Sequence, residues 1–405
     1  MTTVLVHAGP YPVDDRLGGI GIRLWETAQV LADAGHQVTI AAPRFSGFTH
    51  PGVEITTRRW EELLPDHRVL VTTDLPDTRL LLAAHRAGLI LVAENAPPIE
   101  HLHYDALAGP DGQFLYADTV ARWRLQLMLA DHLLVRSEAE RASTLGALVA
   151  TGRLSAAHHR TGPGLEHLVS LVPIGHNRHS AQAAAAAPTG PSVDVVWSGG
   201  SWEYCHPVSL LPALAHARDR GRKLTLRLLY EPGPDFRAQV QALDLGGQVQ
   251  LPEGPLGHRD RDQALNGARC LAVTGARTAE NQTCHRLRLR DAGLYRLPVV
   301  VDPHGATGDL VAALGIGTLA DPADPEALAR ALITGTDDGP PRTSYLAALD
   351  RAAGRFDLAR HLQPLLHLLA DGRPAPDRDE PSQHAAVARL LADAPTLKST
   401  APAII

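Results

Sequence analysis

Short apolar runs alternate along the chain with longer stretches of helical periodicity. The apolar runs at 4–6 and 38–40 each have the length of a strand. Between them, from residue 22 to 34, apolar side chains recur at spacings of three and four, which predicts an amphipathic helix. Further strands are predicted at 69–72, 89–93 and 132–135. This alternation is typical of βαβ units and indicates a parallel sheet.

The alternation restarts after a low-complexity stretch in the middle of the chain. Residues 180–191 are mostly Ala, Pro and Gly, which predicts an interdomain linker, with a surface loop on one large domain as the alternative. Beyond it, strands are predicted at 193–197, 224–229, 248–251, 270–273 and 298–301. We therefore expect an α/β protein of two doubly wound domains, 1–178 and 192–355, joined by a linker over 179–191. Residues 356–405 are expected to form helices and a tail that pack back toward the N-terminal domain.

Composition narrows the classes of protein that this pattern allows. The 405 residues suffice for two or three domains, and 44% apolar with 20% charged residues is ordinary for a globular protein. A net charge of -6 gives no surplus of Lys and Arg for binding nucleic acid. Three cysteines without a CxxC pair favour a reducing, cytoplasmic location. We expect neither a signal peptide nor a transmembrane segment, because no apolar run approaches the roughly 18 residues of a span.

A glycine-rich segment follows the first predicted strand and precedes the first predicted helix. Gly18, Gly19 and Gly21 lie where backbone N–H groups at a helix N-terminus can bind an anion, although a tight turn is the alternative. The second predicted strand ends in Ala41-Ala42-Pro43, without a carboxylate for a ribose. This disfavours a simple Rossmann dehydrogenase.

A second glycine pair follows the first strand of the C-terminal half. Gly199 and Gly200 lie at this strand end, and Trp202 follows them closely. The glycines allow a phosphate to approach the backbone, and the indole offers a face for stacking a base or a sugar. The alternative is that the aromatic side chains of this segment close the edge of the domain.

The segment 280–291 is the richest in candidate chemistry. It contains Glu280, Arg286, Arg288 and Asp291. The planar guanidinium group of arginine can donate paired hydrogen bonds to phosphate oxygens, and a carboxylate can accept two hydrogen bonds from a ribose diol. The alternative is a solvated basic helix, which we expect only for Arg290.

Four stretches in this order resemble retaining GT-B glycosyltransferases of the family-4 type. They are residues 18–43, 130–154, 197–211 (close to the signature of an actinobacterial branch) and 291–300. The resemblance covers about residues 1–355. It implies two Rossmann-like domains that face a cleft, and transfer of a sugar from a nucleoside diphosphate sugar with retention and without a metal. UDP or GDP is the expected nucleotide, with no other cofactor.

The resemblance also implies roles for individual residues. In the family, a glycine-rich loop contacts the diphosphate, and this loop corresponds to Gly18, Gly19 and Gly21. The second carboxylate of the family's motif holds the ribose, and it corresponds to Asp291. The first carboxylate of the motif corresponds to position 283, where this chain has a threonine. Glu280 is therefore expected to contact the donor sugar instead. The family's basic pair is missing from 198–207, and Arg286 and Arg288 are the candidates to supply its charge. Glu280 and Arg286 are therefore the predicted catalytic residues. Gly199, Gly200, Trp202, Arg288 and Asp291 complete the predicted donor-binding set.

The acceptor side is predicted at the end of the strand at 89–93. Many relatives carry a histidine there, and Glu94 takes its place, with Asn95 and His101 nearby in the sequence. The histidines show no convincing metal spacing, and His158-His159 is expected to be a solvated loop. No metal site is therefore predicted.

These features predict a glycosyltransferase of antibiotic or other specialised metabolism that acts on a small-molecule acceptor. One specific version is S-glycosylation of a thiol or thione such as ergothioneine from a GDP-sugar, as in the lincosamide pathway. Synthesis of cell-envelope polysaccharide, an epimerase of GT-B shape and a non-catalytic nucleotide-sugar-binding relative are the alternatives. A homodimer is left open as the oligomeric state.

Overall fold

The computed structural model describes residues 1–94, 107–200, 204–254 and 256–394. The chain divides into two compact units, which are described separately. The first consists of Met1–Asp14, Ile20–Pro173 and Ala359–Ile405, and the second of Asp15–Gly19 and Ile174–Leu358. None of the described helices combines the length and the hydrophobicity that a membrane crossing requires.

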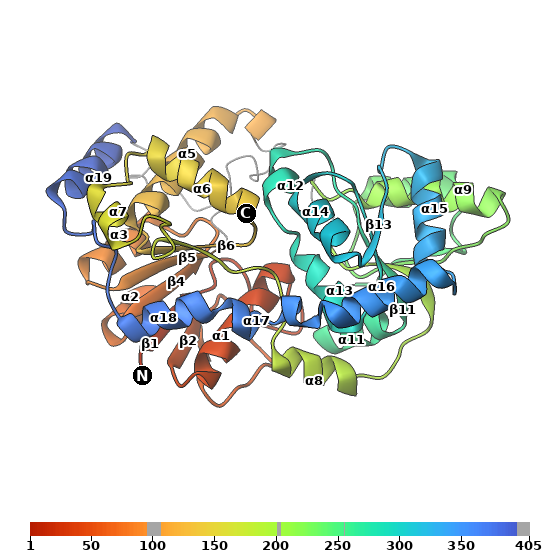
Figure 1. The fold of residues 1–405 in the computed structure, drawn as a ribbon, viewed down its shortest axis with the longest axis horizontal. Helices are drawn as coiled ribbons and strands as arrows, with labels where there is room; N and C mark the ends of the chain where they lie inside the picture. The colour runs from red at the N-terminus through yellow and green to blue at the C-terminus, as the bar shows by residue number, and fades with distance from the viewer. Residues whose placement is uncertain (95–106, 201–203, 255, 395–405) are drawn as a thin grey trace. The chain divides into compact units, whose positions relative to one another are not determined.

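The first unit is built on a parallel sheet of seven strands in the order β3-β2-β1-β4-β5-β6-β7 (Figure 1). The strands are β1 Thr3–His7, β2 Gln37–Ala41, β3 Val53–Thr56, β4 Val69–Thr73, β5 Ile90–Glu94, β6 His132–Val135 and β7 Val169–Leu171. Every residue of β4 and β5 is buried, because helices cover both faces of a doubly wound sheet. From β1 the chain continues to β2 on one side, and from β4 it continues to β5 on the other side. Because both crossovers are right-handed, α1 and α3 lie on opposite faces of the sheet.

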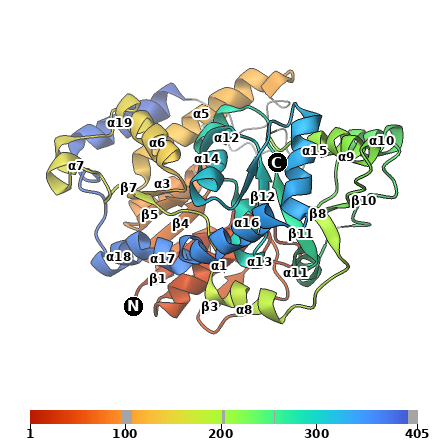
Figure 2. The ribbon, with the colours of Figure 1, turned by 45° about the vertical axis from the view of Figure 1, so that its right-hand side comes forward.

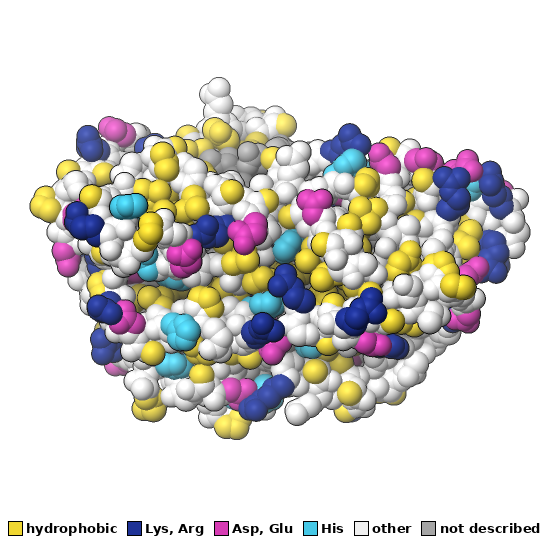
Figure 3. Space-filling view, viewed as in Figure 1, with side chains coloured by type: hydrophobic (Ala, Val, Ile, Leu, Met, Phe, Trp, Pro, Cys, Tyr) yellow, Lys and Arg dark blue, Asp and Glu magenta, His cyan; other side chains and the backbone are white. Residues whose placement is uncertain are grey.

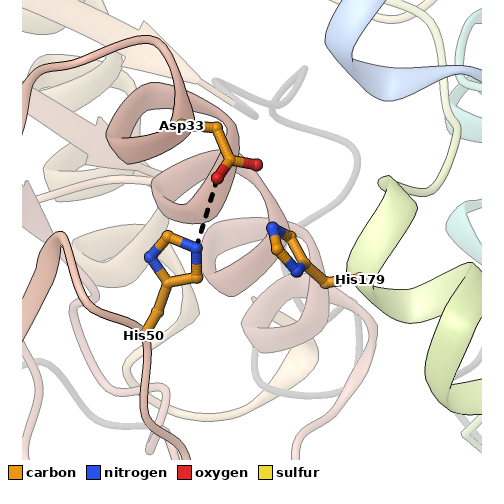
Figure 4. Close-up of side chains that lie close together, drawn as sticks. All are labelled: Asp33, His50 and His179. Atoms are coloured by element: carbon orange, nitrogen blue, oxygen red, sulfur yellow. Dashed lines mark ion pairs between the residues drawn. The ribbon is translucent and has the colours of Figure 1, made fainter.

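The helices of this unit follow the predicted alternation. They are α1 Gly19–Asp33, α2 Trp60–Leu63, α3 Thr78–Arg86, α5 Gly112–Leu129, α6 Glu138–Ala150, α7 Ala156–Thr161, α17 Leu358–His361, α18 Gln363–Asp371 and α19 Pro381–Asp393, with a 3-10 turn at Leu64–Asp66. Helices α3, α5 and α19 pack together over the Leu5, Leu70 and Leu91 face of the sheet. Outside the sheet, Asp33 Oδ1 lies 3.4 Å from His50 Nε2, which ties the end of α1 to the bend before β3 (Figure 4).

The second unit is built on a parallel sheet of six strands in the order β10-β9-β8-β11-β12-β13. The strands are β8 Val193–Trp197, β9 Leu226–Leu228, β10 Val249–Gln250, β11 Ala268–Val273, β12 Val299–Val301 and β13 Gly317–Leu319. Successive side chains of β8 point to opposite faces: Val195 and Trp197 enter one core cluster and Val196 the other. Both sheets of the predicted α/β architecture are therefore confirmed.

Helices cover both faces of this second sheet as well. They are α8 Arg178–Ala186, α9 Leu210–Asp219, α10 Pro234–Ala242, α11 His258–Asn266, α12 Ala279–Thr283, α13 Arg290–Tyr295, α14 Gly305–Leu314, α15 Pro325–Thr336 and α16 Pro340–Arg351, with 3-10 turns at Pro207–Ser209, Leu287–Leu289 and Ala353–Phe356. Helices α9 and α15 lie side by side in both ribbon views (Figures 1 and 2), and their buried leucines share one core cluster.

The segment expected to be a linker is helical over its first half. Asn177 caps α8 by accepting a hydrogen bond from the backbone N–H of Ser180. At the other end of the helix, the side-chain amide of Asn266 donates to the carbonyls of Ala184 and Ala187. Helix formation follows from the alanine content, since alanine has the highest helix propensity. The domain limits at 178 and 192 stay predictions.

Buried ion pairs tie the C-terminal segment into the first unit. Asp377, on the loop between α18 and α19, accepts hydrogen bonds from Arg153 Nε at 3.1 Å and Nη2 at 3.3 Å, and His158 Nε2 lies 3.0 Å away. Next to it, Arg378 Nη1 lies 3.0 Å from Asp131 Oδ2. His158 is fully buried in α7, so the prediction that it lies in a solvated loop is wrong.

The Asp377 carboxylate gives a test of this attachment. Burial alone would raise the pKa of Asp377, but the hydrogen bond from His158 and the charge of Arg153 lower it to about 2. A lowered pKa in the folded state contributes stability above the unfolded pKa, and this contribution is lost as the pH falls toward 2. Asp377→Asn should therefore destabilise the protein by about 3–5 kcal/mol at pH 7, as when a buried pair loses one partner. It should also flatten the loss of stability between about pH 4 and 2.

Chemical denaturation of both proteins across this pH range measures the effect. Asp371→Asn, which removes an exposed partner of Arg373, is the control and should cost less than about 1 kcal/mol. Equal effects of the two substitutions would show that Asp377 contributes no more than a surface charge.

Candidate functional site

The second sheet reverses its strand order between β8 and β11. Open α/β sheets bind ligands at such a switch point, beside the carboxyl ends of the strands. Here β8 is followed by Ser198 and Gly199, and β11 is followed by Thr274 and Gly275. These two turns define what we call the switch-point edge.

Arg288, in the turn before α13, lies across the switch-point edge. Its Nη2 donates to the carbonyl of Thr274 at 3.1 Å, and its Nη1 lies 3.3 Å from the sulfur of Cys205. Its guanidinium carbon lies 4.1 Å from the centre of the Trp197 ring, a cation–π distance. Only 9% of Arg288 is exposed, its Nε–H is buried without a partner, and no carboxylate among the described residues pairs with it. Within the residues that the structure describes, this cation therefore lacks a counter-charge.

The glycines of the switch-point edge leave room for arginine side chains. A Cβ on Gly199 would overlap Nη1 of Arg288 and lie 3.0 Å from its Cδ. A Cβ on Gly275 would overlap the guanidinium of Arg286 and lie 2.8 Å from the amide nitrogen of Asn281. At both strand ends, a side chain larger than glycine would therefore force a packed arginine to shift.

Arg286 is neutralised within the protein. Its Nη1 lies 2.6 Å from Oδ1 of Asp302 and its Nη2 3.1 Å from Oδ2, while its Nε donates to Asn281 Oδ1 at 2.9 Å. Nη1 also donates to the carbonyl of Val273, the last residue of β11. The charge expected to act on a diphosphate is therefore balanced by Asp302, and the side chain joins the ends of β11 and β12.

Asp291 is the most enclosed carboxylate of the predicted set. It is 0% exposed and accepts hydrogen bonds from Ser198 Oγ at 2.7 Å, Arg261 Nη2 at 2.6 Å and Arg290 Nη1 at 3.0 Å. Burial alone would raise its pKa, but the charges of Arg261 and Arg290 outweigh burial and lower it. Arg290 is itself buried, so the prediction of a solvated basic helix is wrong at this position.

The predicted sugar-contacting residue lies on α12. Glu280 is buried in the first turn of this short helix, which Thr278 caps by accepting from the N–H of Asn281. A cavity of about 320 Å³ opens beside it at the carboxyl ends of β11 and β12. Its lining includes Ala276, Arg277, Thr278, Asn281, Gln282, Pro303, His304 and Gly305. Glu280 is not among these lining residues.

The glycines predicted to bind the donor lie at the start of α1 and in the turn after β8. Gly18 has open space where a Cβ would stand, Gly19 begins α1, and Gly21 is buried within it. The carbonyl of Gly200 accepts a hydrogen bond from the Trp197 indole at 3.2 Å. The predicted stacking residue Trp202 lies outside the described residues.

On the first unit, Glu94 ends β5 and is buried. Its Oε1 forms an ion pair with Nε of Arg23 from α1, while Nη1 and Nη2 of Arg23 donate to the carbonyls of Pro173 and Val172. The Oε2 atom of Glu94 is buried and has no hydrogen-bond partner among residues 1–94, 107–200, 204–254 and 256–394. Asn95 and His101, the other predicted acceptor residues, lie outside the described residues.

Surface charge on the face in Figure 3 is mixed in sign. Basic and acidic side chains lie beside one another on this face. The second unit also has exposed ion pairs, such as Arg220–Glu326 and Arg222–Asp337. In contrast, four arginines are buried close to the switch-point edge: Arg261, Arg286, Arg288 and Arg290.

Two residues of this arrangement were not predicted. Asp302 directly follows β12, so the rule that functional groups follow strands could have identified it. Arg261 lies on α11 among the alternating charges of 258–262, and nothing in this pattern marks it as buried.

Comparison with known proteins identifies the fold of the chain through solved structures. No family model matches the chain, and no curated protein matches it. Among solved structures, HepE of Anabaena in complex with UDP and glucose is 16% identical with a TM-score of 0.62, covering 92% of this chain and 100% of that chain. Trehalose-6-phosphate synthase OtsA has a TM-score of 0.65 at 12% identity, with the same coverage. AviGT4, a glycosyltransferase involved in avilamycin A biosynthesis, has a TM-score of 0.57 at 15% identity, with 92% and 99% covered. The chain therefore has the GT-B fold that its sequence predicts.

The fit between Gly199 and Arg288 is open to a direct test. Gly199→Ala should destabilise the protein by about 1–3 kcal/mol, because the added methyl overlaps a packed guanidinium. Arg288→Ala in the same chain removes the overlapping group, so the double variant should cost less than the sum of the single ones. Gly246→Ala, at a position with open space, is the control. Strict additivity in a denaturation cycle would show that the two residues do not compete for space.

Proposed function

We propose that this protein is a glycosyltransferase that transfers a sugar from a nucleoside diphosphate sugar to a small-molecule acceptor. The GT-B fold supports the class, because the neighbours with this fold include glycosyltransferases and a complex with UDP and glucose. The observation that carries the proposal is Arg288, a buried cation at the switch point of the second sheet for which the described part of the chain provides no counter-charge.

Arg288 has the chemistry that a leaving diphosphate requires. Negative charge grows on the diphosphate as the bond to the sugar breaks, and a fixed guanidinium in a water-poor site stabilises this charge. The side chain is held by the Thr274 carbonyl and the Trp197 ring, so little reorganisation is needed. We further propose that the sugar is transferred with retention, and that arginine supplies the positive charge without a metal ion.

The remaining predicted residues complete the proposal. Glu280 would contact the donor sugar, and Gly199 and Gly200 would lie beside the phosphates. Arg286 would support the site by joining the ends of β11 and β12 through Asp302. On the first unit, Glu94 with its unpartnered Oε2 would bind the acceptor, together with Asn95 and His101.

The finer assignment is to specialised metabolism in the cytoplasm. One structural neighbour, AviGT4, is involved in avilamycin A biosynthesis, which is compatible with this version. Another, WaaG, is involved in lipopolysaccharide biosynthesis, so cell-envelope polysaccharide synthesis is kept as the alternative. S-glycosylation of a thiol or thione is the specific form we propose. The second candidate is a non-catalytic nucleotide-sugar-binding protein, and it is favoured by the threonine at 283 and by the neutralisation of Arg286.

Arg288→Gln separates these candidates. The nucleotide is first identified as the one among UDP, GDP and dTDP that raises the melting temperature most. With the corresponding sugar donor, Arg288→Gln should lower kcat about 10²–10³-fold, as when other electrostatic stabilisers are removed. Arg296→Gln, which breaks an exposed pair with Asp350, should leave kcat unchanged.

Two outcomes would contradict the proposal. If the Arg288→Gln variant turns over the sugar donor at the wild-type rate, Arg288 does not take part in catalysis. Nucleotide binding without turnover of any sugar donor, in the presence of varied acceptors, would support the non-catalytic candidate instead.

A further inference from the structure

Asp291 has the surroundings of a counter-ion. Its two oxygens accept from a hydroxyl and two guanidinium groups, and the side chain is completely enclosed. A carboxylate that holds a ribose diol must present oxygen atoms to the ligand. Asp291 presents none, because its oxygens face Ser198, Arg261 and Arg290.

Arg261 has hydrogen-bonding capacity that the protein does not use. Only Nη2 has a partner, Asp291, while Nε and Nη1 are buried without a hydrogen-bond acceptor among the described residues. The residue is only 6% exposed, so bulk solvent has little access to these donors. Buried N–H groups of a charged side chain are costly when unpaired, and in native proteins they need an explanation.

The position of Arg261 supplies that explanation. Its Nη2 binds Oδ2 of Asp291, the same atom that accepts from Ser198 in the turn after β8. Arg288 packs against Gly199, the next residue of that turn. Two buried guanidinium groups with unpaired N–H donors therefore lie beside one turn, at the strand end where the proposed function places a diphosphate.

We propose that Arg261 binds the diphosphate together with Arg288, and that Asp291 is a positioning residue that holds Arg261 rather than a ligand of the ribose. This inference rests on the proposed function. A diphosphate offers several anionic oxygens, so it can pair with both arginines at once. The Asp291 carboxylate then fixes the guanidinium of Arg261 in place.

Calorimetric titration separates the two roles of Asp291. The ligands are inorganic pyrophosphate, the nucleoside diphosphate that binds best among UDP and GDP, and its 2′,3′-dideoxy form. Arg261→Gln should weaken binding of pyrophosphate and of the nucleotide about 10–100-fold, and Arg261→Lys should recover part of the loss. Asp291→Asn should weaken both ligands in the same way, and the double variant should be no weaker than Arg261→Gln alone.

The ribose hydroxyls give the decisive comparison. If Asp291 positions Arg261, Asp291→Asn leaves the preference for the nucleotide over its dideoxy form as in the wild type. If Asp291 binds the ribose, this substitution abolishes the preference and leaves the affinity for pyrophosphate intact, which would overturn the inference. Arg296→Gln is the matched control, an arginine of the same unit that is paired with an aspartate on the surface.

Melting curves and the binding data of the wild-type chain show whether a failed result concerns folding, the proposed function or this inference. Melting curves of each variant identify any that fail to fold, and Arg261→Lys keeps the test available if Arg261→Gln is one of them. A wild-type chain that binds no nucleoside diphosphate would overturn the proposed function and this inference together. A wild-type chain that binds it, with Arg261→Gln binding as tightly, would overturn this inference alone.

Discussion

The burial of arginine charge at the carboxyl edge of the second sheet determines much of the local structure. Removing a guanidinium from water is unfavourable unless a counter-charge or hydrogen bonds replace the water. Asp302 does this for Arg286, while the single carboxylate of Asp291 is shared between Arg261 and Arg290 and leaves two donors of Arg261 unpaired among the described residues. Arg288 packs instead on an aromatic ring and a backbone carbonyl, which leaves its charge available to a ligand.

The same requirement explains residues with no chemistry of their own. Gly199 and Gly275, in the turns after β8 and β11, lack a side chain where Arg288 and Arg286 pack. Asn281 provides an acceptor for Nε of Arg286, and its own amide nitrogen donates to the carbonyls of Tyr204 and Ala276. Loops, strand ends and helix starts of this unit are thus connected through buried polar side chains.

Much of the fold follows from local sequence. The strands at 132–135 and 193–197 were predicted at their observed bounds, because buried parallel strands are continuous apolar runs. Short edge strands such as β3 and β13 were missed, since they contain few apolar residues. The site could be predicted only in part. Arg286 and Arg288 were recognised as important residues, but the partners of their guanidinium groups come from distant parts of the sequence. Asp302 neutralises Arg286 and the sulfur of Cys205 contacts Arg288, and only the tertiary structure brings these groups together.

The central claim is that a diphosphate binds at the turn after β8, between Arg288 and Arg261. A crystal structure of the protein with its nucleoside diphosphate tests this most directly. We expect phosphate oxygens at about 2.7–3.2 Å from nitrogen atoms of Arg288 and Arg261. A diphosphate bound elsewhere, with the two guanidinium groups as buried as in the free chain, would contradict it.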